Sequence, residues 1–105
     1  MNYIIQYDAE LDLDFEIPEL DASLDELLSD LVLNSNHEIR TALATALSHG
    51  IGMGYDHVPV FAVKGSEFIF VLHEEEYGIQ LDKCITYFSD IEAYETCAHL
   101  QKLKF

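Results

Sequence analysis

The sequence predicts an α+β domain in which an antiparallel or mixed β-sheet carries helices on one face, in the approximate order β-β-α-α-β-β-β-α. Three observations lead to this fold class. Half of the residues are hydrophobic, which is enough for a packed core. Period-2 and β-branched stretches alternate with stretches of helical spacing, and several of the latter begin with a capping-box pattern. The length of 105 residues fits a single globular domain over residues 1–105.

Two strands are expected at the N-terminus. Residues 2–7 are apolar and β-prone, and the polar residues 8–10 can turn the chain. Apolar and acidic residues alternate over residues 11–17, so the apolar side chains point to one face and the carboxylates to the other. Pro18 is expected to end this strand or to place it at a sheet edge.

Two helices are expected next. Ser23 and Glu26 form a capping-box pattern before leucines at helical spacing, which predicts a helix over about residues 23–33. Ser35 and Glu38 repeat the pattern and open a second helix, with Gly50 as the left-handed residue that ends it. The glycine-punctuated tract that follows, 51–57, is interpreted as a loop.

A second hairpin is predicted in the centre of the chain. Residues 58–63 and 67–73 are rich in β-branched and aromatic side chains, and the three residues between them include Gly65, which can adopt a left-handed conformation.

The remaining residues are interpreted as strand followed by helix. Residues 79–81 and 84–88 are expected to supply one further strand, or two. Ser89 and Glu92 form a third capping-box pattern before a terminal helix. The side of that helix facing the core is predicted to carry Ile91, Tyr94, Ala98 and Leu103.

Charge is the most unusual property of the chain. There are 20 Asp and Glu against 5 Lys and Arg, a formal net charge of −15 at pH 7. A small domain needs a net charge of only about 2 to 8 for solubility. Carboxylates are repelled by nucleic acid and by anionic membrane surfaces, so neither is expected as a direct partner. The sequence therefore indicates a basic protein as partner, and no small-molecule substrate is expected.

The acidic residues are concentrated near the N-terminus. Half of them lie between Asp8 and Asp30, and the first basic residue is Arg40. Alternate residues of a strand lie about 6.6 Å apart on one face. If the turn does not break the register, a ladder of carboxylates facing a cationic groove is therefore expected from Asp8, Glu10, Asp12, Asp14 and Glu16. A solvated face, or an edge protected by charge against further pairing, is the alternative interpretation. The predicted partner-binding residues are Asp12, Asp14, Glu16, Glu19, Asp21, Asp25, Glu26 and Asp30, together with the second cluster Glu74, Glu75 and Glu76.

Metal and cofactor sites are not expected. The alternating acids lack the glycine that an EF-hand calcium loop needs for its sharp turn. His37-Glu38 fails the H-E-x-x-H zinc pattern at its second histidine, and the five histidines have no ligand spacing. Asp56 and His57 could line a pocket. The glycines at 50–54 follow a helix, whereas nucleotide-binding loops follow a strand.

Catalysis is not expected either. Cys84 and Cys97 are predicted to be buried free thiols, and His73 and His99 are the histidines considered as their partners for nucleophilic catalysis. Acidic surroundings would raise a thiol pKa and leave the nucleophile protonated. No stretch has the features of a signal peptide or the length of a membrane span, so a soluble cytoplasmic protein is expected.

In charge, size and element order the chain resembles two groups of small acidic binders. One group is the immunity proteins that neutralise nuclease toxins, and the other is the DNA mimics that occupy nucleic-acid-binding sites. Both imply that carboxylates engage the Lys and Arg residues that otherwise contact phosphates. The immunity interpretation is preferred because, between Glu38 and Glu67, Asp56 is the one acidic residue, whereas a DNA mimic spreads its charge. A non-catalytic adaptor subunit is a third hypothesis, with candidate contacts at Tyr55, Tyr77, Tyr87 and Tyr94.

Overall fold

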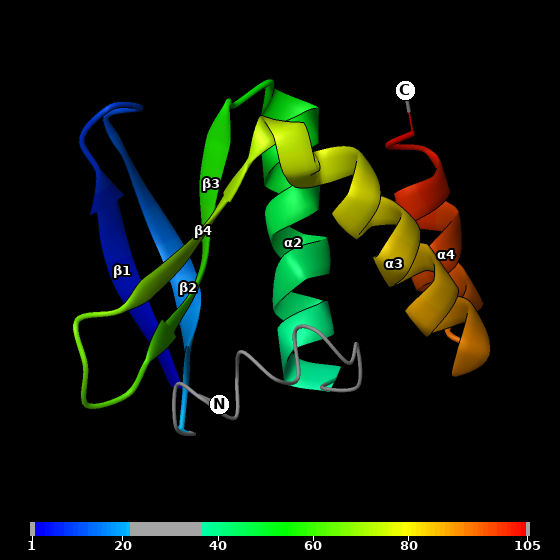
Figure 1. Cartoon of the computed structure of the whole chain (residues 1–105), viewed down its shortest axis with the longest axis horizontal. Coiled ribbons are helices and arrows are strands. Elements are labelled where there is room, and N and C mark those ends of the chain that lie inside the picture. Colours follow the sequence, from blue (N-terminus) through cyan, green and yellow to red (C-terminus); the bar gives the residue numbers. More distant parts are fainter. Residues whose placement is uncertain (1, 22–36, 105) are drawn as a thin grey trace.

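The computed structural model describes residues 2–21 and 37–104, which form an α+β domain and confirm the predicted fold class (Figure 1). In the sequence a helix lies between the two β-hairpins, and further helices follow the second hairpin. In chain order the elements are β1 (Asn2–Asp8), β2 (Leu13–Leu20), α2 (His37–Met53), β3 (His57–Val63), β4 (Ile69–His73), a short 3-10 helix η1 (Glu74–Glu76), α3 (Tyr77–Asp90) and α4 (Tyr94–Gln101).

The sheet is mixed and has the strand order β1-β2-β3-β4. β1 pairs with β2, and β3 with β4, as antiparallel hairpins. The two hairpins are joined by a short parallel pairing, in which Glu19 lies opposite Ala62 and Leu20 opposite Val63. In Figure 1 all three described helices lie on one side of the sheet, as the sequence predicts, with α2 next to the sheet and α3 and α4 outside α2.

The core lies between the sheet and the helices. β2 contributes Phe15 and Ile17, while β3 is buried over residues 58–63. Leu43 and Leu47 of α2 are fully buried against this layer. None of the helices in the described part of the chain combines the length and the apolar character needed to cross a membrane.

The second strand begins and ends later than predicted. The turn occupies residues 9–12, and β2 continues through Pro18 to Leu20. The ring of Pro18 removes a backbone N–H donor, which is tolerated where a strand has no hydrogen-bonding neighbour. β3 pairs with β2 only from Glu19 onward, so this condition is met on that side of Pro18.

The prediction that Gly50 ends the helix is wrong. α2 continues to Met53, and the left-handed residue after it is Gly54, with φ of 73°. Gly50 is buried against α3, where a Cβ would lie 2.6 Å from the phenol oxygen of Tyr77. It is therefore a glycine required by packing between helices, and residues 51–53 of the expected loop are helical.

The strands predicted over residues 79–81 and 84–88 are also wrong, because this segment is the helix α3. Its buried residues are Tyr77, Leu81, Cys84 and Phe88, whose spacing of three and four residues is the helical period.

The pattern at Ser89 and Glu92 does not cap a helix. It lies at the end of α3 and in the following turn, and Glu92 has a positive φ of 61°. The last helix, α4, begins at Tyr94 and buries Cys97 and Leu100. Of the four side chains predicted to face the core, Ile91, Tyr94 and Ala98 are exposed and Leu103 is half-buried. The helix predicted over residues 23–33, and Ser35 of the second capping box, lie outside the described residues.

Candidate functional site

The turn between β1 and β2 breaks the predicted ladder of carboxylates. The backbone N–H of Leu11 donates to Asp8 Oδ1 at 3.0 Å, and Asp12 has a φ of 54°. A short polar side chain tolerates this left-handed conformation better than a branched one. Because four residues form the turn, only Asp14 and Glu16 lie on the same strand and face.

The pairing of β1 with β2 sets which side chains share the face of Asp14 and Glu16. Directly opposite residues of an antiparallel pair lie on the same face. The facing pairs are Tyr3 with Pro18, Ile5 with Glu16, and Tyr7 with Asp14. We call these six residues the hairpin face.

The hairpin face combines apolar and acidic groups at the surface. Tyr3 is 57% exposed, Ile5 63% and Tyr7 53%, which is unusual for large apolar side chains arranged in one row. The Tyr7 hydroxyl donates to Asp12 Oδ1 at 2.7 Å, so Asp12 lies beside this row. The predicted acids Asp12, Asp14 and Glu16 are thus next to exposed apolar side chains.

The sequence did not reveal the apolar row. Residues 2–7 contain apolar side chains at consecutive positions, Ile4 and Ile5, so no alternation indicates which of them is exposed. The facing acids of β2 supply the missing signal once the register is known, because Glu16 lies opposite Ile5.

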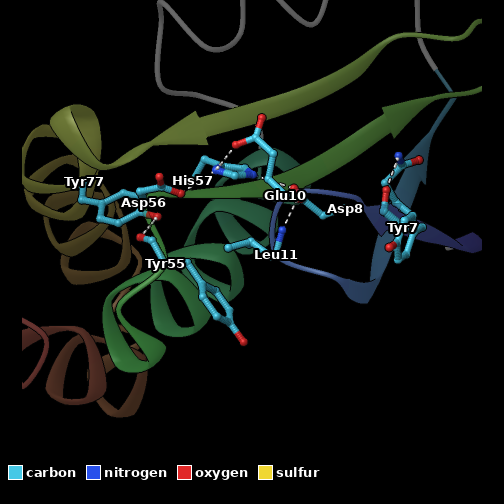
Figure 2. Close-up of polar contacts among 9 residues, drawn as sticks. Tyr7, Asp8, Glu10, Leu11, Tyr55, Asp56, His57 and Tyr77 are labelled. Carbon is cyan, nitrogen blue, oxygen red and sulfur yellow. Dashed lines mark hydrogen bonds and ion pairs between the residues drawn. The ribbon is translucent and has the colours of Figure 1, made fainter.

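His57 connects the first hairpin to the second. Its Nε2 lies 2.7 Å from Asp8 Oδ2, and its Nδ1 lies 2.7 Å from Asp56 Oδ1 (Figure 2). Glu10 Oε2 is 3.9 Å from the same Nδ1. An ionised carboxylate only accepts hydrogen bonds, so both ring nitrogens must donate, and this arrangement requires the imidazolium form.

The pKa values of the pair shift in the direction that this geometry requires. Burial of His57 disfavours its charged form, but the hydrogen bonds to Asp56 and Asp8 outweigh burial and raise its pKa above 6.5. Burial alone would raise the pKa of Asp8, yet the hydrogen bonds from Leu11 and His57 lower it below 3.8. Asp8 and His57 therefore form an ion pair between about pH 3.8 and 6.5. The side chain of Asp8 is 15% exposed and that of His57 is 11% exposed.

The two acidic clusters of the sequence meet around His57. A shallow cavity of about 440 Å³ lies there, and η1 contributes two of the predicted acids to it. We call this site the acidic pocket. Its charged and polar lining consists of Asp8, Glu10, Asp56, His57, His73, Glu74 and Glu75. The backbone N–H of Glu74 donates to the Asp56 carbonyl at 2.9 Å, which fixes η1 beside β3.

The negative field of the acidic pocket reaches the adjoining helix. Burial, followed by the charges of Glu74, Asp56 and Glu75, raises the pKa of Tyr77 to about 12. The phenol of Tyr77 donates to the Tyr55 carbonyl at 2.8 Å.

The other predicted partner-binding residues are placed elsewhere. Glu19 lies opposite Asn2 on the other face of the hairpin and is half-buried, and Glu76 is exposed at the start of α3 outside the pocket lining. Asp21 is exposed, with Oδ2 3.9 Å from Lys64 Nζ. Asp25, Glu26 and Asp30 lie outside the described residues.

The basic residues are segregated from these acids. Arg40 is only 1% exposed, with Nη1 3.2 Å from Gln80 Oε1, so it contributes little positive surface. The four lysines are exposed, at the β3–β4 turn and on or after α3 and α4: Lys64, Lys83, Lys102 and Lys104. The hairpin face and the acidic pocket contain no Lys or Arg.

The two thiols considered as nucleophiles lie in the interior of the fold. Both cysteines are buried, and burial raises the pKa of Cys84 even though Arg40 opposes this shift. The cause is therefore burial rather than the acidic surroundings that the sequence suggested. Within residues 2–21 and 37–104, no group of three His, Cys, Asp or Glu side chains is arranged to hold a metal ion.

The tyrosines considered as adaptor contacts are mostly part of the interior. Tyr77 is buried and Tyr55 and Tyr87 are half-buried, whereas Tyr94 is 64% exposed. The exposed tyrosines of the hairpin face are a different set.

Comparisons of the chain with models of protein families, with curated proteins and with solved structures gave no match.

Proposed function

We propose that the chain is an immunity-type inhibitor that binds and neutralises a basic protein, such as a nuclease toxin. The observation that carries the proposal is the segregation of charge. The acids of the hairpin face and the acids of the acidic pocket form two clusters, each without Lys or Arg, on a chain with a net charge of −15. A field of one sign on one surface accelerates encounter with an oppositely charged protein and suppresses wrong partners.

The apolar row supports a specific complex rather than diffuse attraction. Charge complementarity mainly raises the association rate, whereas buried aromatic and aliphatic side chains supply most of the binding energy. Tyr3, Ile5 and Tyr7 can serve as such anchors, with Asp14 and Glu16 beside them to engage Lys or Arg. A cationic groove that normally holds phosphates would then be occluded.

The test is capture of the partner followed by measurement of association. The purified chain is used to capture proteins at low salt, with elution at about 0.5 M salt, where the Debye length falls below roughly 5 Å. The captured protein is then produced separately, and its nuclease activity and its association rate are measured with the chain. We expect a basic nuclease, inhibited at one-to-one stoichiometry, whose association slows about tenfold when Asp12, Asp14 and Glu16 become Asn, Asn and Gln.

A matched variant controls for net charge. Asp90→Asn, Glu92→Gln and Glu95→Gln remove the same number of charges from the end of α3, from the turn after it and from α4, so their effect should be less than about threefold. If no basic protein binds in a salt-dependent manner, the proposed function is wrong. Competition with DNA for several unrelated basic proteins would indicate a DNA mimic instead, and equal slowing by both variants would exclude the hairpin face as the contact.

A further inference from the structure

Over residues 2–7, before Asp8, β1 is an edge strand without the usual protection against further pairing. In the described part of the chain, its neighbour in the sheet is β2 alone. The pairing runs from Asn2 with Glu19 to Asp8 with Leu13 without a register shift, so no bulge bends the edge away. Residues 2–7 also contain no proline, lysine or other charged residue. Natural sheets normally use these features to prevent addition of a further strand.

The side chains of β1 define what an added strand would contact on each face. On the hairpin face are the exposed Tyr3, Ile5 and Tyr7. On the opposite face, Ile4 and Gln6 are half-buried, and Ile4 packs against the core. An added strand lies about 4.8 Å from its neighbour, and its alternate side chains point to opposite faces. Each face of the added strand would therefore meet a different environment.

Charge selects the occupant of the edge. Pairing of β1 with β1 of a second copy would bring together two hairpins, each with five acidic residues between Asp8 and Glu16 and no basic residue. Repulsion between them opposes this dimer. A cationic segment is attracted by the same charges, and the Lys or Arg side chains that it places on the side of the hairpin face could lie over the rings of Tyr3 and Tyr7.

We propose that the β1 edge binds an extended segment of the basic partner, in which cationic and apolar side chains alternate. The cationic side chains lie on the side of the hairpin face, from which their long stems extend across β1 toward Asp14 and Glu16, and the apolar side chains extend the core beside Ile4. Backbone hydrogen bonds to β1 provide the affinity, and the alternation provides the specificity. This inference rests on the proposed function and adds the mode of binding.

The experiment uses defined peptides rather than the partner. The first peptide has Lys and Val alternating over seven residues, with blocked termini. The second has the same composition, with all lysines before all valines. Two further versions of the first peptide carry N-methyl groups, on the backbone of the lysines or of the valines, and so keep the charge while removing alternate N–H donors. Affinity is measured by calorimetry, and the site is located from the backbone amide NMR signals of the protein.

We expect the alternating peptide to bind best, to shift the amide signals of residues 3–7, and to lose at least tenfold in affinity in one of its two N-methylated versions. A pair of protein variants provides the control. Ile5→Lys and Ile79→Lys make the same change at side chains that are 63% and 61% exposed, on β1 and on α3. Ile5→Lys should weaken binding of the alternating peptide at least tenfold, and Ile79→Lys less than about threefold. Thermal unfolding of both variants verifies that they fold.

Three outcomes would overturn the edge proposal. Equal binding of all four peptides would show that the attraction is diffuse, and absence of binding by any peptide would show that the edge is closed. A dimer in sedimentation experiments that Ile5→Lys abolishes would assign the edge to a second copy. None of these results affects the capture of a salt-sensitive basic nuclease, so failure of the edge proposal and failure of the proposed function are distinguishable.

Discussion

The two hairpins of the sheet have the same antiparallel architecture but different environments. β3 is buried over residues 58–63, with Val58 against Leu72 on one face and Pro59 against Val71 on the other. In β2, Phe15 and Ile17 are buried while Asp14 and Glu16 are exposed. A strand buried on both faces is a continuous apolar run, and a strand buried on one face alternates.

This difference explains where the chain can carry function. Every side chain of β3 over residues 58–63 contributes to the core, so a change there alters packing. The first hairpin retains a free face, on which acids and apolar residues are held in fixed register without supporting the core. We therefore expect stability and binding to be separable in the first hairpin.

The largest difference in the free energy of unfolding is expected between substitutions on opposite faces of the first hairpin. Ile17 is 3% exposed and Ile5 is 63% exposed, and they lie on adjacent strands. Ile17→Ala should lower the free energy of unfolding by about 2–5 kcal/mol, because it leaves a cavity in the core. Ile5→Ala should lower it by no more than about 1 kcal/mol, the range of strand propensity. Urea unfolding followed by circular dichroism measures both values, and similar losses would mean that the hairpin face is part of the core.

The next effect concerns the helical layer that covers the second hairpin. A Cβ at Gly50 would lie 2.6 and 2.8 Å from atoms of the Tyr77 ring, whereas nothing lies within 4 Å of a Cβ at Gly52. Gly50→Ala should therefore destabilise the fold by about 1–3 kcal/mol through overpacking between α2 and α3. Gly52→Ala, in the same helix, should stabilise it by up to about 1 kcal/mol. A gain in stability from Gly50→Ala would contradict the close approach of the two helices.

The smallest expected change in the free energy of unfolding depends on pH and arises from the contact between Asp8 of the first hairpin and His57 of the second. The raised pKa of His57 stabilises the fold fully below pH 6.5, and this stabilisation is lost as pH rises through its folded pKa. The lowered pKa of Asp8 stabilises the fold above pH 3.8, and this is lost as pH falls through its folded value. The joint contribution is therefore largest between about pH 4 and 6.5.

Removal of the imidazole tests this contribution. His57→Gln should lower the free energy of unfolding by about 1–2 kcal/mol near pH 5.5 and by much less at pH 9. His49→Gln, at an exposed histidine of α2, serves as the matched control and should change the free energy of unfolding by no more than about 0.5 kcal/mol. An equal loss at both pH values for His57→Gln would show that packing of the ring, and not the ion pair, is responsible.

Sequence patterns predicted some elements well and others poorly, for identifiable reasons. The hairpin around Gly65 is confirmed, with a φ of 79° at that residue, because a turn has a local and specific requirement. Its connection is longer than the three residues predicted, since β4 begins at Ile69 and not at residue 67. The sequence predicts strand within α3 because residues 79–81 and 84–88 are short, β-prone stretches. The spacing of the buried residues Tyr77, Leu81, Cys84 and Phe88 is instead helical. Gly50 was misplaced because a glycine required by a distant tyrosine cannot be distinguished from a helix-ending glycine by local sequence.

The sequence by itself determined the fold class, the excess of acid and its concentration before Arg40, because composition and period are properties of neighbouring residues. The tertiary structure decided which of these acids act together. It broke the ladder at the turn and brought Glu74 and Glu75 to Asp8 and Glu10 around His57. It also placed the acids of β2 beside the exposed side chains of β1. The reason is that strand register and contacts between distant residues depend on packing of the whole chain, which no local pattern contains.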